Sequence, residues 1–208
     1  MTEKQRRIAM TIAGVLISGF SVGIFNFSLF GMDPFQVLAH GLWNLTSIGY
    51  GTFYMIINLV MLIGIFFLDK TKIGLGTVIN IFLLGYVVEF SSWLFNTAIP
   101  DPSFILRSGA LVVGILIISF GSALYFTGNM GVSTYDAVAL LMSEKKIAKF
   151  QYCRIATDLV CTITGFAFGA TVGVGTLVTA LFMGPIIAFF NRTVAIPLRY
   201  GKTQKGHQ

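Results

Sequence analysis

The stretch VGVGTLVTALFMG, residues 172–184, closely repeats an earlier stretch of the chain, IGLGTVINIFLLG, residues 73–85. Both begin apolar-Gly-apolar-Gly-Thr, both end on Gly at the same distance, and they lie 99 residues apart. A second occurrence of such a phrase in so short a chain predicts that the protein is built from two copies of one unit.

The similarity extends beyond these two stretches and keeps almost the same offset. GMDPFQVL (31–38) aligns with GVSTYDAV (131–138), and ISGF (17–20) with IISF (117–120), both at an offset of 100. Asn58 aligns with Asp158 at the same offset, and one residue is then lost before the opening phrase. Chance similarity among glycine-rich apolar segments is the alternative. The constant register favours a first unit at 1–98 and a second at 99–208.

The composition is that of a membrane protein. The chain has 208 residues, of which 55% are hydrophobic and only 11% charged, against about 25% charged in soluble domains. Its mean hydropathy is +0.83. About 20 apolar residues span a bilayer, and backbone groups in lipid must be satisfied within a helix. Six runs meet this requirement: Ile8–Phe30, Gly49–Leu68, Ile73–Phe95, Phe104–Phe126, Tyr152–Ala170 and Gly173–Phe190.

The net charge of +6 does not indicate a nucleic-acid partner, because the basic residues follow the positive-inside rule. With the N-terminus in the cytoplasm and six spans, only Arg107 of the 14 basic residues falls outside. We therefore expect a bacterial plasma membrane protein with both termini cytoplasmic. Its basic tail, from Asn191 onward, is expected to lie on the anionic inner leaflet.

Three helices per unit is an odd number, so the second copy enters the membrane upside down. The sequence thus predicts an all-α integral membrane protein, a single membrane domain over 1–208. Its six transmembrane helices form a 3+3 inverted-topology repeat, a pattern that many transporters share. A short extra helix is expected after helices one and four. The bilayer is the predicted partner, and a homo-oligomer is left open.

Three motifs resemble a known family. They are G-x-x-P/T-[FY]-[QD] after the first helix of each unit, G-x-G-T, and F-x-G-P-x-I within FMGPIIAF, residues 182–189. Together they resemble the bacterial YczE/YyaS/YitT-type membrane proteins over nearly the whole chain. The resemblance implies a small multi-pass bacterial membrane protein, and some relatives are associated with secondary-metabolite production. It supports fold and location more than any activity.

The segments 31–45 and 131–146 each predict a short helix with a good N-cap. Asp33 precedes Pro34, and Ser133 precedes a first turn that contains Tyr135 and Asp136; such residues favour helix starts. The two helices either lie flat on opposite membrane faces or dip inward. If they dip inward, their N-termini carry partial positive charge and would suit an anionic ligand.

Polar residues within the apolar runs are candidates for substrate or ion binding. Charges inside a bilayer face a cavity or a partner, which applies to Glu89 and Asp158. For Glu89 the alternative is a protonated or hydrogen-bonded packing residue near the outer end of its helix. Arg154 and Asp158 are spaced i,i+4 and can pair on one helix face, with a purely structural pair as the alternative. Asn58 and Asn80 are interpreted first as interhelical hydrogen-bonding groups and second as ligand contacts.

The G-x-G-T phrases are not dinucleotide-binding loops, because no strand or βαβ unit surrounds them. Glycine permits a tight connection and close helix approach, so packing is the first interpretation. A broken helix start that lines a pathway is the alternative. The residues concerned are Gly74, Gly76, Thr77, Gly173, Gly175 and Thr176.

The sequence contains no catalytic motif such as HExxH or GxSxG and no Cys/His cluster, so we expect neither an enzyme nor a metal or cofactor. A permease for a small metabolite or organic anion, with a central site between the repeats, is the favoured function. One alternative is a regulator or scaffold that acts through its cytoplasmic SEKKIAK loop, residues 143–149. The other is a substrate-binding subunit of an importer, suggested by Ala9-x-x-x-Ala13.

Overall fold

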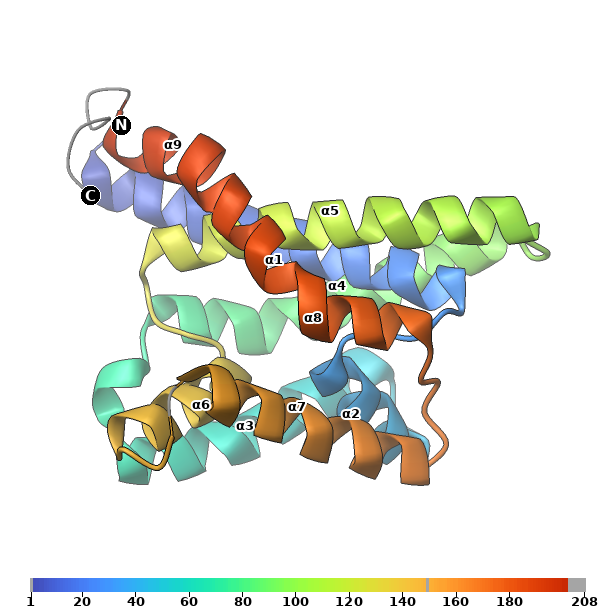
Figure 1. Ribbon diagram of the computed structural model, residues 1–208, viewed down its shortest axis with the longest axis horizontal. Helices are drawn as coiled ribbons and strands as arrows, with labels where there is room; N and C mark the ends of the chain where they lie inside the picture. The colour runs from blue at the N-terminus through green and yellow to red at the C-terminus, as the bar shows by residue number, and fades with distance from the viewer. Residues whose placement is uncertain (1, 149, 202–208) are drawn as a thin grey trace.

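The computed structural model describes residues 2–148 and 150–201, and these ranges are helical throughout apart from short connections (Figure 1). Each predicted apolar run coincides with a long helix, and each predicted short helix is present. In chain order the elements are α1 Glu3–Ser28, α2 Pro34–Trp43, α3 Tyr50–Leu68, η1 Lys70–Lys72, α4 Leu75–Ala98, α5 Phe104–Gly128, α6 Thr134–Glu144, α7 Phe150–Ala167, α8 Val174–Phe190, η2 Asn191–Ala195 and α9 Ile196–Tyr200.

Five helices in the described ranges are long and apolar enough to cross a bilayer: α1, α3, α4, α5 and the continuous segment from α8 to α9. Their outer faces carry large apolar side chains such as Phe67 and Ile105, each more than four-fifths exposed. Lipid is the environment that suits such a surface. α7, which is 18 residues long and carries Arg154 and Asp158, is not among the five.

The helices form two groups (Figure 1). α1 packs against α4 and α5, and α5 packs against α8, which gives a group of long helices. In the second group the short helices α2 and α6 each contact both α3 and α7. Contacts between α3 and α4 join the groups. The short helices are therefore enclosed by long ones on several sides.

α1 and α5 cross closely and run antiparallel, as two matching contacts demonstrate. A Cβ added to Gly14 would lie 2.7 Å from the carbonyl oxygen of Gly121. Further along α1, the Ser21 hydroxyl donates to the carbonyl oxygen of Gly114 at 2.7 Å. The two contacts use corresponding positions of the two helices: Gly14 corresponds to Gly114, and Ser21 to Gly121, each 100 residues later. Small residues at both points allow the backbones to approach.

The connections that follow α1 and α5 repeat each other in backbone conformation. Leu29 and Asn129, 100 residues apart, each end a helix in the left-handed region, with φ of 55° and 49°. Gly31 and Gly131 follow with φ of 101° and 112°, which glycine adopts without a steric cost. Both connections therefore turn the chain back into the molecule by the same route.

Each of these connections is held by a G-x-G-T phrase from the other half of the chain. The Gly175 amide donates to the Phe30 carbonyl at 2.7 Å, and the Gly76 amide donates to the Met130 carbonyl at 2.6 Å. The Thr77 hydroxyl adds a hydrogen bond to the Val132 carbonyl at 2.7 Å. The phrases thus begin α4 and α8 and also anchor the approach to α2 and α6.

The two short helices lie inside the bundle rather than flat on its surface. Phe35 and Gln36 in the first turn of α2 are buried, as are Thr134 and Tyr135 in the first turn of α6. The rings of Phe35 and Tyr135 stack at a centroid distance of 4.9 Å and an interplanar angle of 16°. The N-termini of α2 and α6 therefore meet in the interior.

The C-terminal segment differs from the expected surface-lying tail. From Asn191 the chain continues α8 through the π-helical turn η2 into α9, which packs against α1 and α5. Arg199 donates to the Thr127 carbonyl at 2.7 Å and pairs with Glu3 at 3.6 Å. This part of the tail therefore packs against other helices of the protein. Residues 202–208 of the predicted tail and Lys149 of the predicted cytoplasmic loop lie outside the described residues.

Candidate functional site

A cavity between the helices, here called the central cavity, surrounds the starts of α2 and α6. Its volume is about 530 Å³, within the range of small-molecule sites, about 300–1,000 Å³. Helices from both groups contribute to its wall. The structure brings six residues singled out from the sequence to this cavity: Asp33, Asn80, Tyr135, Asp136, Arg154 and Asp158.

Side chains cap the first-turn amides of α2 and one first-turn amide of α6. Asp33 Oδ1 accepts hydrogen bonds from the Phe35 and Gln36 amides at 3.2 and 3.3 Å. Ser133 Oγ accepts from the Asp136 amide at 3.1 Å, and its hydroxyl donates to Asp136 Oδ2 at 2.6 Å. These caps occupy the Phe35, Gln36 and Asp136 amides, which are donors that would otherwise attract an anionic ligand.

Arg154 forms a compact ion-pair cluster with two carboxylates on the wall of the cavity. Its Nε lies 3.3 Å from Asp158 Oδ1, the i,i+4 pair expected from the sequence. Its Nη1 pairs with Asp136 of α6, a partner that the sequence spacing does not reveal. The guanidinium lies over the Tyr135 ring, 4.3 Å from the centroid, and the Tyr135 hydroxyl donates to Asp158. The single guanidinium is thus shared between two carboxylates.

Two polar groups on the cavity wall have no hydrogen-bond partner among the described residues. They are the Tyr125 hydroxyl on α5 and Asn80 Oδ1 on α4, and both residues are more than nine-tenths buried. Buried polar atoms normally have partners. Tyr125 was missed by sequence reasoning, because a tyrosine within an apolar run is typical of a helix core. Both residues line the cavity, so unused hydrogen-bonding capacity lies beside it.

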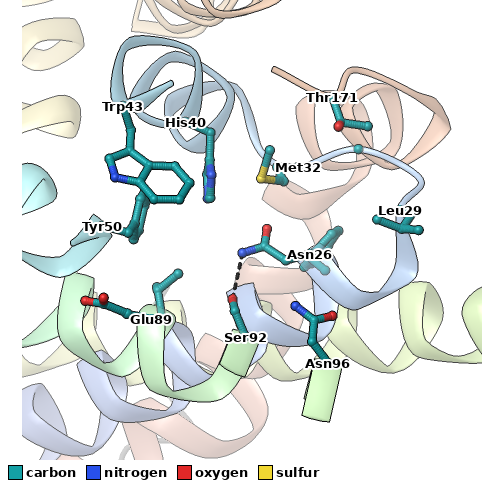
Figure 2. Close-up of a pocket in the computed structure, with 13 residues that line it drawn as sticks. Asn26, Leu29, Met32, His40, Trp43, Tyr50, Glu89, Ser92, Asn96 and Thr171 are labelled. Carbon is teal, nitrogen blue, oxygen red and sulfur yellow. Dashed lines mark hydrogen bonds between the residues drawn. The ribbon is translucent and has the colours of Figure 1, made fainter. Parts of the chain in front are cut away.

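A second cavity, of about 350 Å³, lies beside the end of α1 and the start of α3 (Figure 2). The His40 and Tyr50 rings stack at 4.3 Å on one of its sides. Asn26 Nδ2 donates to the Ser92 hydroxyl at 2.9 Å on another. Asn26 Oδ1 and His40 Nε2 have no partner among the described residues. This cavity is therefore also partly polar.

Glu89 belongs to the second cavity and not to the central one. Its Oε2 accepts a hydrogen bond from the Gly51 amide at 2.9 Å. Gly49, the N-cap residue of α3, has no side chain to cap that helix, so a residue of α4 supplies the carboxylate. Negative charge at a helix N-terminus is favourable. The structure thus gives Glu89 a capping role.

A thin layer of side chains separates the two cavities. Gln36 lines the central cavity and Tyr50 lines the second, and the Tyr50 hydroxyl donates to Gln36 Oε1. On α4, Leu84 faces the central cavity and Val88, one turn later, faces the second. The two spaces are therefore next to each other along the molecule.

The remaining predicted site residues lie away from both cavity walls. Asn58 is fully buried, donates to the Tyr54 carbonyl at 2.8 Å and accepts from the Thr134 hydroxyl. It thus links α3 to the start of α6, which matches its first interpretation as an interhelical group. The G-x-G-T residues form the connections described above. These are Gly74, Gly76, Thr77, Gly173, Gly175 and Thr176.

The carboxylates of the central cavity do not converge on one point. Within residues 2–148 and 150–201, no three His, Cys, Asp or Glu side chains are grouped so that they could hold a metal ion. Cys153 and Cys161 are both free and buried. The chemistry available in the cavity is therefore hydrogen bonding, ion pairing and contact with aromatic rings.

Comparisons with known proteins show what the chain as a whole is similar to. The family described as "Family of unknown function (DUF6198)" matches residues 5–192. An "Uncharacterized protein" of Haemophilus influenzae is 24% identical, covering 93% of this chain and 87% of its own. From Bacillus subtilis, the "Uncharacterized membrane protein YczE" is 24% identical (85% and 81% covered) and the "Uncharacterized protein YyaS" 22% (85% and 88%). The expected resemblance to YczE and YyaS is confirmed. No solved structure matches.

Proposed function

Because the chain belongs to the DUF6198 family and has the helices of a membrane protein, we propose that it is a permease for a small metabolite. The observation that carries the proposal is the central cavity, a largely apolar space of about 530 Å³ between the helices whose wall also carries one guanidinium and three carboxylates. Polar and charged groups are costly inside a membrane and mark substrate pathways. A purely structural bundle has no need of unpartnered polar groups there.

The proposed topology has six spans in two inverted halves, 1–98 and 99–208. It is supported by the antiparallel crossing of α1 and α5, by the matching contacts at that crossing, and by the reciprocal G-x-G-T junctions. α7 is the proposed sixth span, with Arg154 and Asp158 directed to the cavity wall rather than to lipid. α2 and α6 are then re-entrant helices that approach the centre from opposite faces.

The proposed orientation has both termini in the cytoplasm of a bacterial cell. It is supported by the basic residues, of which only Arg107 of the 14 falls outside. In this orientation the second cavity opens toward the exterior and the central cavity lies deeper. Alternating access is the proposed mechanism: the layer containing Tyr50 and Gln36 opens while the cytoplasmic route closes.

The charge of the cavity changes the expected class of substrate. An organic anion was expected because free amides at helix N-termini attract negative charge. Asp33 and Ser133 already cap three of those amides, on Phe35, Gln36 and Asp136. Asp33, Asp136 and Asp158 face the single guanidinium of Arg154, so the cavity favours a neutral or positively charged metabolite. The cavity is proposed to bind and move its ligand without chemical conversion, since the sequence has no catalytic motif.

A substitution that obstructs the cavity tests the permease proposal. Gly184 lies on the cavity wall, and a Cβ added there meets no atom within 4 Å. Gly184 is exposed, so Gly184→Trp places a large ring at the edge of the cavity at little packing cost and should obstruct it. Gly64, on the exposed side of α3, is equally free of contacts and lines neither cavity, so Gly64→Trp is the matched control.

The measurement is uptake of isotope-labelled ethanolamine, alanine, succinate and glycerol into proteoliposomes. We expect at least one solute to enter faster than into protein-free vesicles, with the excess abolished by Gly184→Trp and kept by Gly64→Trp. Equal uptake by both variants would overturn the central cavity as the pathway. Uptake of all four solutes at the protein-free rate would favour the regulator function instead.

A further inference from the structure

We infer that the central cavity binds a small organic cation that carries N–H donors, with Asp33 as its counter-charge. This inference rests on the proposed permease function and names the substrate class for the same site. Three observations carry it: the position of Asp33, the charge balance of the cavity wall, and the unpartnered acceptors of two lining residues, Asn80 and Tyr125.

The cavity wall carries more negative than positive charge. Three carboxylates, Asp33, Asp136 and Asp158, face one guanidinium, so two formal negative charges are in excess. Arg154 is committed to Asp136 and Asp158 and to the face of the Tyr135 ring. Its positive charge is therefore already compensated. An anionic ligand would meet two or three carboxylates and no free cation on this wall.

Asp33 is the carboxylate left without a cation. Its Oδ1 caps the first turn of α2, while no hydrogen bond or ion pair reaches its Oδ2 from any residue within the described ranges. Arg154 makes its ion pairs with Asp136 and Asp158 instead. The α2 amides compensate part of its charge, and a carboxylate without a cation in the protein interior remains costly. A cationic ligand beside Asp33 would supply the missing partner.

The uncharged groups of the wall complement a nitrogen cation as well. Asn80 Oδ1 accepts hydrogen bonds only, and the Tyr125 hydroxyl can accept one, and both are unpartnered in the described part of the chain. Tyr54 and Phe126 contribute aromatic rings, which attract cations over their faces. An ammonium group has three N–H donors to distribute, which matches a carboxylate and two further acceptors.

The site is built for an organic cation and not for a metal ion. Bound Mg²⁺ or Ca²⁺ needs six or more converging oxygen ligands, water included, whereas the described carboxylates do not form a metal-binding group. The volume of about 530 Å³ is that of a site for a multi-atom ligand. A primary amine or guanidinium on a small carbon skeleton satisfies both the charge and the space.

The charge preference can be measured without knowing the natural substrate. Cys153 and Cys161 are replaced by alanine, and Ser122, a half-buried residue of the cavity wall, is replaced by cysteine. The probes are a cationic 2-aminoethyl and an anionic 2-sulfonatoethyl methanethiosulfonate. Each labelling rate is divided by that of the same reagent with a free small thiol. We expect a normalised preference for the cationic reagent of about tenfold or more, as charged clefts produce.

Matched Asp→Asn variants identify the carboxylate responsible. Asparagine caps helices as well as aspartate does, so Asp33→Asn removes the charge and keeps the cap on α2. It should lower the preference severalfold. Asp69 is the control, because it lies outside the long helices and hydrogen bonds from Thr71 hold its pKa below the ordinary 3.8. Asp69→Asn should leave the preference unchanged.

Competition tests the requirement for N–H donors. Ethylammonium should slow labelling of Ser122→Cys, while tetramethylammonium, with equal charge and no N–H group, should not. Equal rates for both reagents, a preference for the anionic one, or no effect of Asp33→Asn would overturn the inference and leave the permease proposal standing. Failure of both reagents to label Ser122→Cys would instead overturn the proposal that this cavity is a solvent-accessible pathway.

Discussion

The crossing of α2 and α7 is the contact whose disturbance should do most to displace the central cavity. A Cβ added to Gly41 would lie 2.4 Å from the carbonyl oxygen of Gly165, and one added to Gly165 would lie 2.2 Å from the carbonyl oxygen of Val37. Ordinary contacts of this kind are 3.4–4 Å. Gly41→Ala should therefore push α2 and α7 apart by about 1 Å.

The expected cost follows from two opposing effects. Forcing an extra carbon into a packed contact costs about 1–3 kcal/mol, while alanine stabilises a helix over glycine by about 0.5–1 kcal/mol. Gly64→Ala on α3 keeps the second effect and lacks the first, because no atom lies within 4 Å of the added Cβ. The free energies of unfolding of the two variants should therefore differ by about 1–3 kcal/mol, with Gly41→Ala the less stable.

Thermal unfolding in detergent, followed by circular dichroism, checks this prediction. For a chain of about this length, 1 kcal/mol shifts the Tm by about 2–4 °C, so the two variants should differ by several degrees. The cysteine at position 122 should also change its labelling rate in the Gly41→Ala background, since α2 begins at the cavity wall. Equal melting temperatures for Gly41→Ala and Gly64→Ala would refute the close crossing of α2 and α7.

Three further substitutions address the site and its supports. Arg154→Met leaves Asp136 and Asp158 unpaired and should destabilise the protein by about 2–4 kcal/mol, which calorimetry measures; a second change, Asp158→Asn, should recover part of the loss. Tyr125→Phe removes an unpartnered buried hydroxyl and should raise stability by about 1 kcal/mol while reducing amine uptake into proteoliposomes. Thr77→Val removes the hydrogen bond to the Val132 carbonyl and should cost about 1–3 kcal/mol by chemical denaturation, whereas Thr77→Ser should retain most of it.

The long helices were predictable because hydropathy alone determines them. The run Phe104–Phe126 became α5, Phe104–Gly128, and the run Gly49–Leu68 became α3, Tyr50–Leu68. The G-x-G-T phrases were correctly placed at helix starts, because a glycine pair between two apolar runs marks a connection in the local sequence alone. Their contacts with Phe30 and Met130 could not be predicted, because these join residues from opposite halves of the chain.

The position of the short helices could not be decided from the sequence for a physical reason. α2 reads PFQVLAHGLW, apolar around most of its circumference. Such a helix is equally stable against lipid and against other helices, so its pattern does not distinguish a surface position from an interior one. The same ambiguity hid Asp136 as the second partner of Arg154, because that pair forms only when α6 packs beside α7.

The two halves share backbone features but differ in the side chains that they bring to the centre. Gln36, Tyr54 and Asn58 stand at the positions that Asp136, Arg154 and Asp158 occupy 100 residues later. The second half thus carries a charged cluster, in which the Arg154 guanidinium pairs with the Asp136 and Asp158 carboxylates of the same half.

Asp33 reverses this relationship, since the residue 100 positions later is the neutral Ser133. Asp33 therefore belongs to the half that contributes no cation to the cavity wall, and the Arg154 of the other half already pairs with Asp136 and Asp158. A ligand cation bound at Asp33 and in contact with Tyr125 would touch α2 from one half and α5 from the other. The same charge that satisfies Asp33 would then also draw the two halves together, which is the coupling between binding and closure that alternating access requires.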